Sequence, residues 1–65
     1  MNAQALLIGI DDAAEMLSMT PRRLIRLARQ GVVPVIDLGD GEMRFSPDDL
    51  REWVKGLTRQ EAVPS

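Results

Sequence analysis

Cysteine and histidine are both absent from this sequence of 65 residues. Without them there is no disulfide, no thiolate nucleophile and none of the usual zinc ligands, and a lack of cysteine fits the reducing cytosol. The longest apolar runs are a few residues long, whereas a membrane-spanning helix needs about 20, and residues 1–7 lack the basic region of a signal peptide. We therefore expect a cytoplasmic protein that binds no metal, carries no cofactor and does not associate with a membrane.

The sequence is equally poor in catalytic groups. A nucleophilic triad, a metal cluster and a phosphate-binding glycine loop are all missing. The acidic pairs Asp11/Asp12 and Asp48/Asp49 lie at predicted helix starts, where the helix dipole favours negative charge. A chain of this length makes one small domain with a limited core. We therefore expect that the protein is not an enzyme.

Residues 20–31 carry the clearest structural signals that are present. Thr20 can cap the free N–H groups at the start of a helix, and Pro21 suits the first helical position. Gly31 can adopt the left-handed conformation that closes a helix. These signals predict one short helix with both ends marked.

The two faces of this predicted helix differ in chemistry. At about 100° per residue, Leu24, Leu27 and Ala28 fall on one face, which predicts contact with a core. Three arginines form a stripe on the opposite face, a fourth lies on its flank, and an isoleucine is placed beside them. These residues are Arg22, Arg26 and Arg29 in the stripe, Arg23 on the flank, and Ile25.

The charge of this helix contrasts with the rest of the chain. The formal net charge is −2, yet no acidic residue occurs between Glu15 and Asp37, and four of the eight basic residues fall between positions 22 and 29. Arg22 and Arg26 form a like-charge pair at i,i+4 spacing, and such pairs repel. An anionic partner would compensate this repulsion, although an arginine-rich solvent face is the plainer alternative.

The segment before the arginine-rich helix predicts another helix, Ile10–Leu17, with Gly9 as its N-cap. The tight turn Ser18-Met19 would join the two helices. Two short helices joined by about three residues form a helix-turn-helix, whose second helix enters the DNA major groove.

The segment after the arginine-rich helix predicts a hairpin and a third helix. Val35–Leu38 and Met43–Phe45 are candidate strands, and residues 39–42 between them carry a strong turn signal. Ser46-Pro47 repeats the cap-and-proline pattern, and a helix with an apolar face follows. That face consists of Leu50, Trp53, Val54 and Leu57, with Trp53 expected to anchor the core.

The predicted order of elements is that of a winged helix-turn-helix, a small and mainly α-helical domain with a β-hairpin wing. Residues 1–7 would form an N-terminal extension, residues 8–57 the DNA-binding domain, and residues 58–65 a flexible tail.

Several short motifs follow one another from Ile8 to about Val54. They are Asp12-Ala13-Ala14-Glu15 followed by Leu17; Thr20-Pro21-Arg22; Leu24, Arg26 and Gly31 before Val32-Val33-Pro34; Arg44-Phe45 at the end of the wing; and Leu50 with Trp53 in the last helix. With this ordered set the chain resembles the MerR-like winged-helix proteins that include phage and mobile-element excisionases, which are recombination directionality factors. The resemblance implies DNA binding without covalent chemistry.

The resemblance also implies partners. Neighbouring copies would bind adjacent repeats on double-stranded DNA cooperatively, bend the DNA and help an integrase to assemble an excisive complex. No dimerisation helix is visible, so we expect a monomer in the absence of DNA. The expected DNA contacts are Thr20 and Arg22 at the helix N-terminus, Arg23 and Arg26 along the helix, Ile25 on a thymine methyl, Arg29 on a phosphate, and Arg44 from the wing.

The sequence departs from that family at three places. Ser18 stands where a glycine is common, which would strain a left-handed turn, and Ile25 stands where an aromatic residue is frequent. The wing tip carries Asp40 and Glu42 in place of basic or neutral residues, and DNA phosphates would repel them. Arg44 therefore either provides the wing's DNA contact or is held in an ion pair by Glu42.

Two other functions fit the same residues. A small transcriptional regulator would use the same helix and wing, and an integrase gene and attachment site beside its gene would argue for excision instead. A protein-interaction module would dock the arginine-rich helix on an acidic protein, and salt-sensitive binding to random duplex DNA would argue against it.

Overall fold

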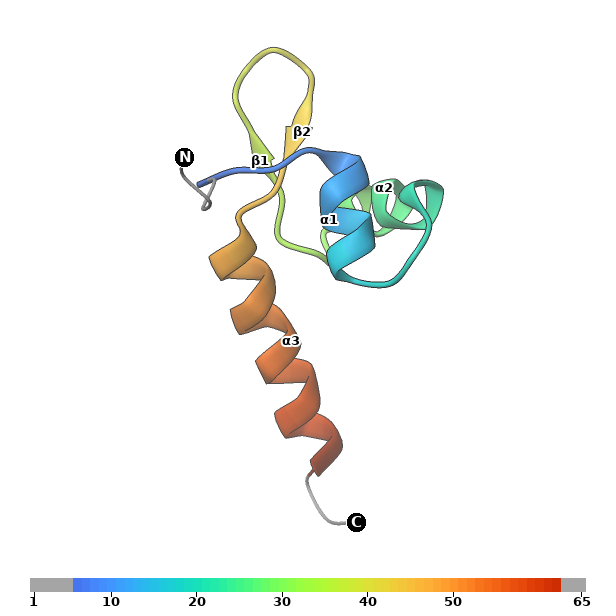
Figure 1. Ribbon diagram of the computed structural model, residues 1–65, viewed down its shortest axis with the longest axis vertical. Helices are drawn as coiled ribbons and strands as arrows, with labels where there is room; N and C mark the ends of the chain where they lie inside the picture. The colour runs from blue at the N-terminus through green and yellow to red at the C-terminus, as the bar shows by residue number, and fades with distance from the viewer. Residues whose placement is uncertain (1–5, 63–65) are drawn as a thin grey trace.

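The computed structural model describes residues 6–62, which form three helices and one two-stranded antiparallel sheet (Figure 1). In chain order the elements are α1 (Ile10–Met16), α2 (Pro21–Arg29), β1 (Ile36–Asp37), β2 (Met43–Arg44) and α3 (Pro47–Ala62). This order confirms the predicted winged helix-turn-helix. Within the described residues, no helix is both long and apolar enough to cross a lipid bilayer.

The turn between α1 and α2 is closed by backbone hydrogen bonds. The N–H of Ser18 donates to the carbonyl of Glu15 (3.1 Å), and the N–H of Met19 donates to that of Ala14 (3.0 Å). Ser18 has a φ of 56°, so it holds the left-handed position of a Schellman motif. The strain expected at Ser18 is therefore present, and α1 ends at Met16, one residue before the predicted end, with Leu17 as its C-cap.

Helix α2 has the ends that its sequence predicts. The Thr20 hydroxyl oxygen accepts a hydrogen bond from the N–H of Arg23 (3.2 Å), and Pro21 occupies the first helical position. Gly31, with a φ of 76°, donates from its N–H to Ala28 (3.0 Å), while Val32 donates to Leu27 (3.0 Å). The same Schellman motif closes α1, but here glycine holds the left-handed position, which it adopts without strain.

The core gathers residues from all three helices and from the end of the wing. The buried residues are Ala13 and Ala14 of α1, Leu24 and Ala28 of α2, Val33 of the connection, Phe45 after β2, and Leu50 of α3. The small side chains of Ala13 and Ala14 allow α2 to approach α1 closely. Leu27 and Trp53 are half-buried and pack against this cluster, so the predicted core face of α2 is confirmed.

The wing has shorter strands than predicted, because Val35, Leu38 and Phe45 lie outside them. The paired residues are Ile36 with Arg44 and Asp37 with Met43. Two Asx turns end the ladder early. Asp37 Oδ1 accepts a hydrogen bond from the N–H of Gly39 (2.8 Å), and Asp40 Oδ1 accepts one from the N–H of Glu42 (3.0 Å). The turn thus uses backbone groups that a longer hairpin would pair across the strands.

Phe45 leaves the wing to pair with the N-terminal segment instead. The N–H of Ile8 donates to Phe45 (2.8 Å), and the N–H of Phe45 donates to Ile8 (2.9 Å). Ile8 also packs against the core, whereas Leu6 is exposed. The N-terminal extension was predicted over residues 1–7; of these, residues 1–5 lie outside the described part of the chain.

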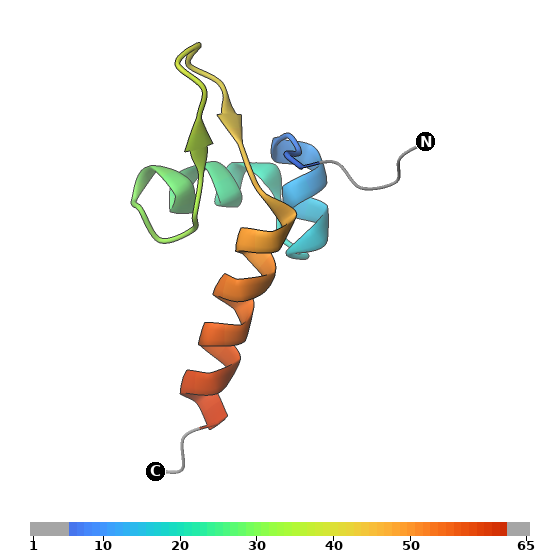
Figure 2. The same cartoon turned by 90° about the vertical axis from the view of Figure 1, so that its left-hand side faces the viewer.

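Helix α3 runs away from the rest of the domain on the side opposite the wing (Figures 1 and 2). The prediction of a tail from residue 58 is wrong for residues 58–62, because α3 continues to Ala62; residues 63–65 lie outside the described part. One glycine, Gly56, costs a helix about 1 kcal/mol, and exposed ion pairs of Arg51 with Asp48 and of Lys55 with Glu52 favour its continuation.

Candidate nucleic-acid interface

The exposed face of α2 carries the four arginines predicted from the helical period. Arg22, Arg23, Arg26 and Arg29 are exposed, while Ile25 between them is half-buried. The opposite face holds the buried core residues of the helix. The fold therefore presents an arginine surface, defined here as Arg22, Ile25, Arg26 and Arg29, with Arg23 at its edge.

The arginines of α2 differ in their partners from the basic side chains that the structure describes elsewhere. Arg44 pairs with Glu42, Arg51 with Asp48, and Lys55 with Glu52. Among the side chains that the structure describes, no ion pair involves an arginine of α2. Guanidinium groups stay charged at any physiological pH. This surface therefore carries positive charge that nothing in the described part of the chain neutralises.

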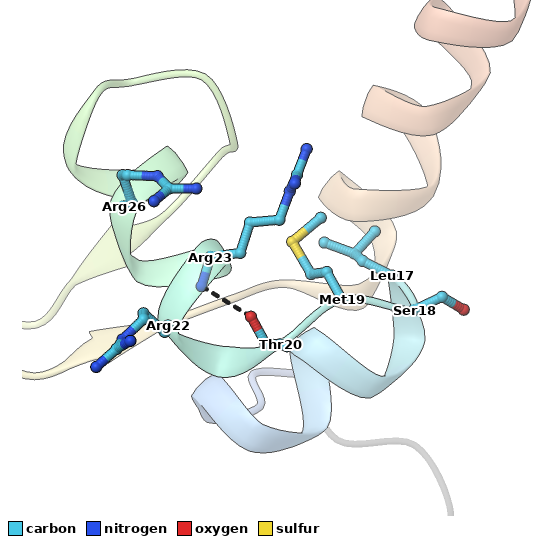
Figure 3. Close-up of a pocket in the computed structure, with 7 residues that line it drawn as sticks. All are labelled: Leu17, Ser18, Met19, Thr20, Arg22, Arg23 and Arg26. Carbon is cyan, nitrogen blue, oxygen red and sulfur yellow. Dashed lines mark hydrogen bonds between the residues drawn. The ribbon is translucent and has the colours of Figure 1, made fainter.

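The start of α2 and the preceding turn line one open groove (Figure 3). The lining residues are Leu17, Ser18, Met19, Thr20, Arg22, Arg23 and Arg26. Arg22 points away from Arg23, so the two neighbouring guanidinium groups serve different sides of the helix start (Figure 3). Thr20 uses its hydroxyl oxygen to cap the helix, which leaves its O–H able to donate to a phosphate.

Ile25 lies where two further open grooves meet. One runs along α2 and is lined by Arg22, Ile25, Arg26, Arg29 and Gln30. The other lies between α2 and the wing, and its lining includes Ile25, Arg29, Glu42 and Arg44. Ile25 and Arg29 therefore connect the arginine surface to the wing.

Arg44 is held by the residues immediately before it in the wing. Its Nη2 lies 2.8 Å from Glu42 Oε1, and its Nη1 donates to the carbonyl of Met43 (3.2 Å). The Arg44 side chain is 31% exposed and that of Glu42 is 64% exposed. Of the two alternatives for Arg44, the ion pair is thus present in the free protein.

The predicted residues fall into two groups in space. The arginines of α2 with Ile25 and Thr20 form one continuous surface, and Arg44 stands across a groove from it. Gln30 was not predicted, although it lies four residues after Arg26 and helical spacing would have found it. The described residues contain no group of acidic side chains that could hold a metal ion.

Residues 7–58 match the helix-turn-helix domain family, and the match spans α1, α2, the wing and most of α3. The chain belongs to the helix-turn-helix domain family. This family includes excisionase-like DNA-binding proteins. Neither a curated protein nor a solved structure matches the chain. In this helix-turn-helix protein, α2 is the second helix of the motif, which is the position of the recognition helix in DNA-binding members of this fold.

Proposed function

We propose that this helix-turn-helix protein is a sequence-specific excisionase, which binds repeats at an attachment site, bends the DNA and directs an integrase toward excision of a phage or mobile element. The observation that carries the proposal is the arginine surface on α2, whose positive charge has no partner among the described side chains. The membership of excisionase-like proteins in the family supports the choice of this function.

In the proposed complex, α2 lies in the major groove. Thr20 and Arg22 meet a phosphate or a base edge at the positive end of the helix dipole. Arg23 and Arg26 contact bases or the backbone, and an arginine bidentate to guanine discriminates by about 1–3 kcal/mol. The half-buried Ile25 offers its apolar surface to a thymine methyl, and Arg29 neutralises a phosphate.

These few contacts read only a short stretch of sequence. One copy would bind with low specificity, because so few side chains can reach base edges. Several copies on adjacent repeats would add their contacts and bend the intervening DNA. The bent array would then present the attachment site to an integrase.

A gel-shift titration at several salt concentrations tests the proposal. It compares a duplex from the attachment region nearest the gene with a scrambled duplex of equal length. Arg22→Ala and Arg26→Ala variants run beside the native protein, and Arg51→Ala serves as a matched control because that arginine lies on α3 and is paired with Asp48. Stepwise, cooperative shifts on the attachment duplex, lost only in the α2 variants, are expected.

Other outcomes separate the alternatives. Equal, weak binding to both duplexes would contradict the excisionase function and point to a target elsewhere, such as a promoter. Absence of any shift at low salt would overturn DNA binding itself and assign α2 to an acidic protein partner.

A further inference from the structure

The one basic side chain that the structure describes in the acidic wing, Arg44, is held in an ion pair. Arg44 Nη2 contacts Glu42 Oε1 at 2.8 Å, and Arg44 Nη1 donates to the neighbouring Met43 carbonyl at 3.2 Å. Glu42 directly precedes β2 and Arg44 ends it, and the ion pair brings the two side chains together. Both residues line the groove that faces Ile25 and Arg29 of α2.

We propose that Glu42 is an intramolecular competitor of DNA phosphate for Arg44, and that it is therefore a specificity-determining residue. This inference rests on the proposed DNA binding by α2. The Glu42 carboxylate occupies the position on the guanidinium that a phosphate oxygen would take. Arg44 contributes to binding only where the duplex fits closely enough against the wing for a phosphate to displace the carboxylate.

Competition of this kind needs a weak ion pair, and the geometry provides one. The Glu42 side chain is 64% exposed, and exposed ion pairs stabilise a protein only slightly. A phosphate held at the right place can therefore replace Glu42, whereas a poorly fitting duplex cannot. The ion pair therefore lowers the affinity for DNA of arbitrary sequence. It lowers the affinity less for a duplex that fits closely against the wing.

The second wing carboxylate allows the competition to be separated from simple repulsion. Asp40 Oδ1 accepts the N–H of Glu42 (3.0 Å) and so holds the turn, but Asp40 forms no ion pair among the described side chains. Asp40→Asn keeps an acceptor oxygen for that hydrogen bond and removes one negative charge. It is therefore a matched control for Glu42→Gln.

The experiment uses the whole chain and a fluorescent duplex of mixed sequence, with affinity measured against salt concentration. The proteins are the native chain, Asp40→Asn, Glu42→Gln, Arg44→Gln and the double variant of residues 42 and 44. We expect Glu42→Gln to raise affinity about two- to fivefold and to steepen the log–log salt slope by up to about 0.9, as one further phosphate contact would. In the Arg44→Gln background the same change should leave the slope unaltered.

Three results would overturn the inference. Equal gains from Asp40→Asn and Glu42→Gln, whether or not Arg44 is present, would mean that the wing carboxylates only repel DNA. Weaker binding by Glu42→Gln would mean that Glu42 contacts the DNA directly. Absence of salt-sensitive binding by the native chain would remove the proposed function as well. If the native chain binds DNA but Glu42→Gln has the same effect with and without Arg44, only this inference is removed.

Discussion

At the scale of single residues, Ser18 and Gly31 occupy the same position in two copies of one motif. Each follows the C-cap of a helix of the helix-turn-helix with a positive φ, 56° for Ser18 and 76° for Gly31. A side chain with a Cβ atom costs roughly 1–2 kcal/mol in this conformation, and glycine avoids that cost. The turn between α1 and α2 is thus closed by a strained residue, while the exit from α2 is not.

Ser18→Gly should stabilise the protein. We expect the free energy of unfolding to rise by about 1 kcal/mol, which for a domain of this size corresponds to a melting temperature higher by about 4–8 °C. Thermal unfolding followed by circular dichroism measures it. Ser18→Ala is the control, because it removes the hydroxyl but keeps the Cβ atom; equal melting of the two variants would contradict the role of backbone strain.

At the scale of elements, two glycines without close neighbours have opposite effects on helices. A Cβ atom added at Gly56 or at Gly31 would meet nothing within 4 Å. Gly56 lies inside α3, where glycine is a poor helix former. Gly31 lies beyond α2 with a positive φ that alanine rarely adopts.

Alanine at these two positions should therefore change stability in opposite directions. Gly56→Ala should increase helix content and raise the free energy of unfolding by about 0.5–1 kcal/mol, whereas Gly31→Ala should lower it by about 1 kcal/mol. Circular dichroism at low temperature and through the melting transition gives both quantities. The same direction of change for both variants would show that packing, rather than backbone conformation, decides the outcome.

The starts of elements were predictable from the sequence because their signals are local. The caps Thr20 and Ser46 act within three residues, and both hydrogen bonds are present. The end of α3 was not predictable from Gly56, because one glycine is only a weak stop signal and the ion pairs on the exposed face favour the helix. The pairing of Ile8 with Phe45 joins segments far apart in the chain, so no local signal specifies it.

Part of the candidate site likewise follows from local sequence signals, and part depends on long-range contacts. The arginine surface of α2 follows from the helical period alone. The closeness of Glu42 and Arg44 in the sequence made their ion pair one of two alternatives, and the structure contains that pair. The groove lined by Ile25, Arg29 and residues of the wing depends on where the hairpin stands relative to α2. Only the tertiary structure could place these residues together.

At the scale of the whole molecule, one small core holds every element in place. Phe45 is the largest fully buried side chain among the described residues, and its backbone also pairs with Ile8. A domain of this size rarely has more than about 3–5 kcal/mol of stability from its core. The loss of one large core side chain is therefore comparable with the whole stability.

Phe45→Ala should leave the chain mostly unfolded at room temperature. Such substitutions cost about 3–5 kcal/mol, so the cooperative thermal transition should be lost and DNA binding with it. Leu6→Ala is the control, because that side chain is 87% exposed and its removal should change the melting temperature little. A cooperative transition near that of the native chain would contradict the central place of Phe45 in the core.

Trp53 gives the molecule an optical property that follows from its place in α3. It is the single tryptophan, the chain has no tyrosine, and its ring is half-buried against the core. Fluorescence excited at the red edge of protein absorption therefore comes from one site on α3, separate from the arginine surface of α2. The emission reports whether α3 is packed against the core. Folding can therefore be followed without a label in the same cuvette in which DNA is added.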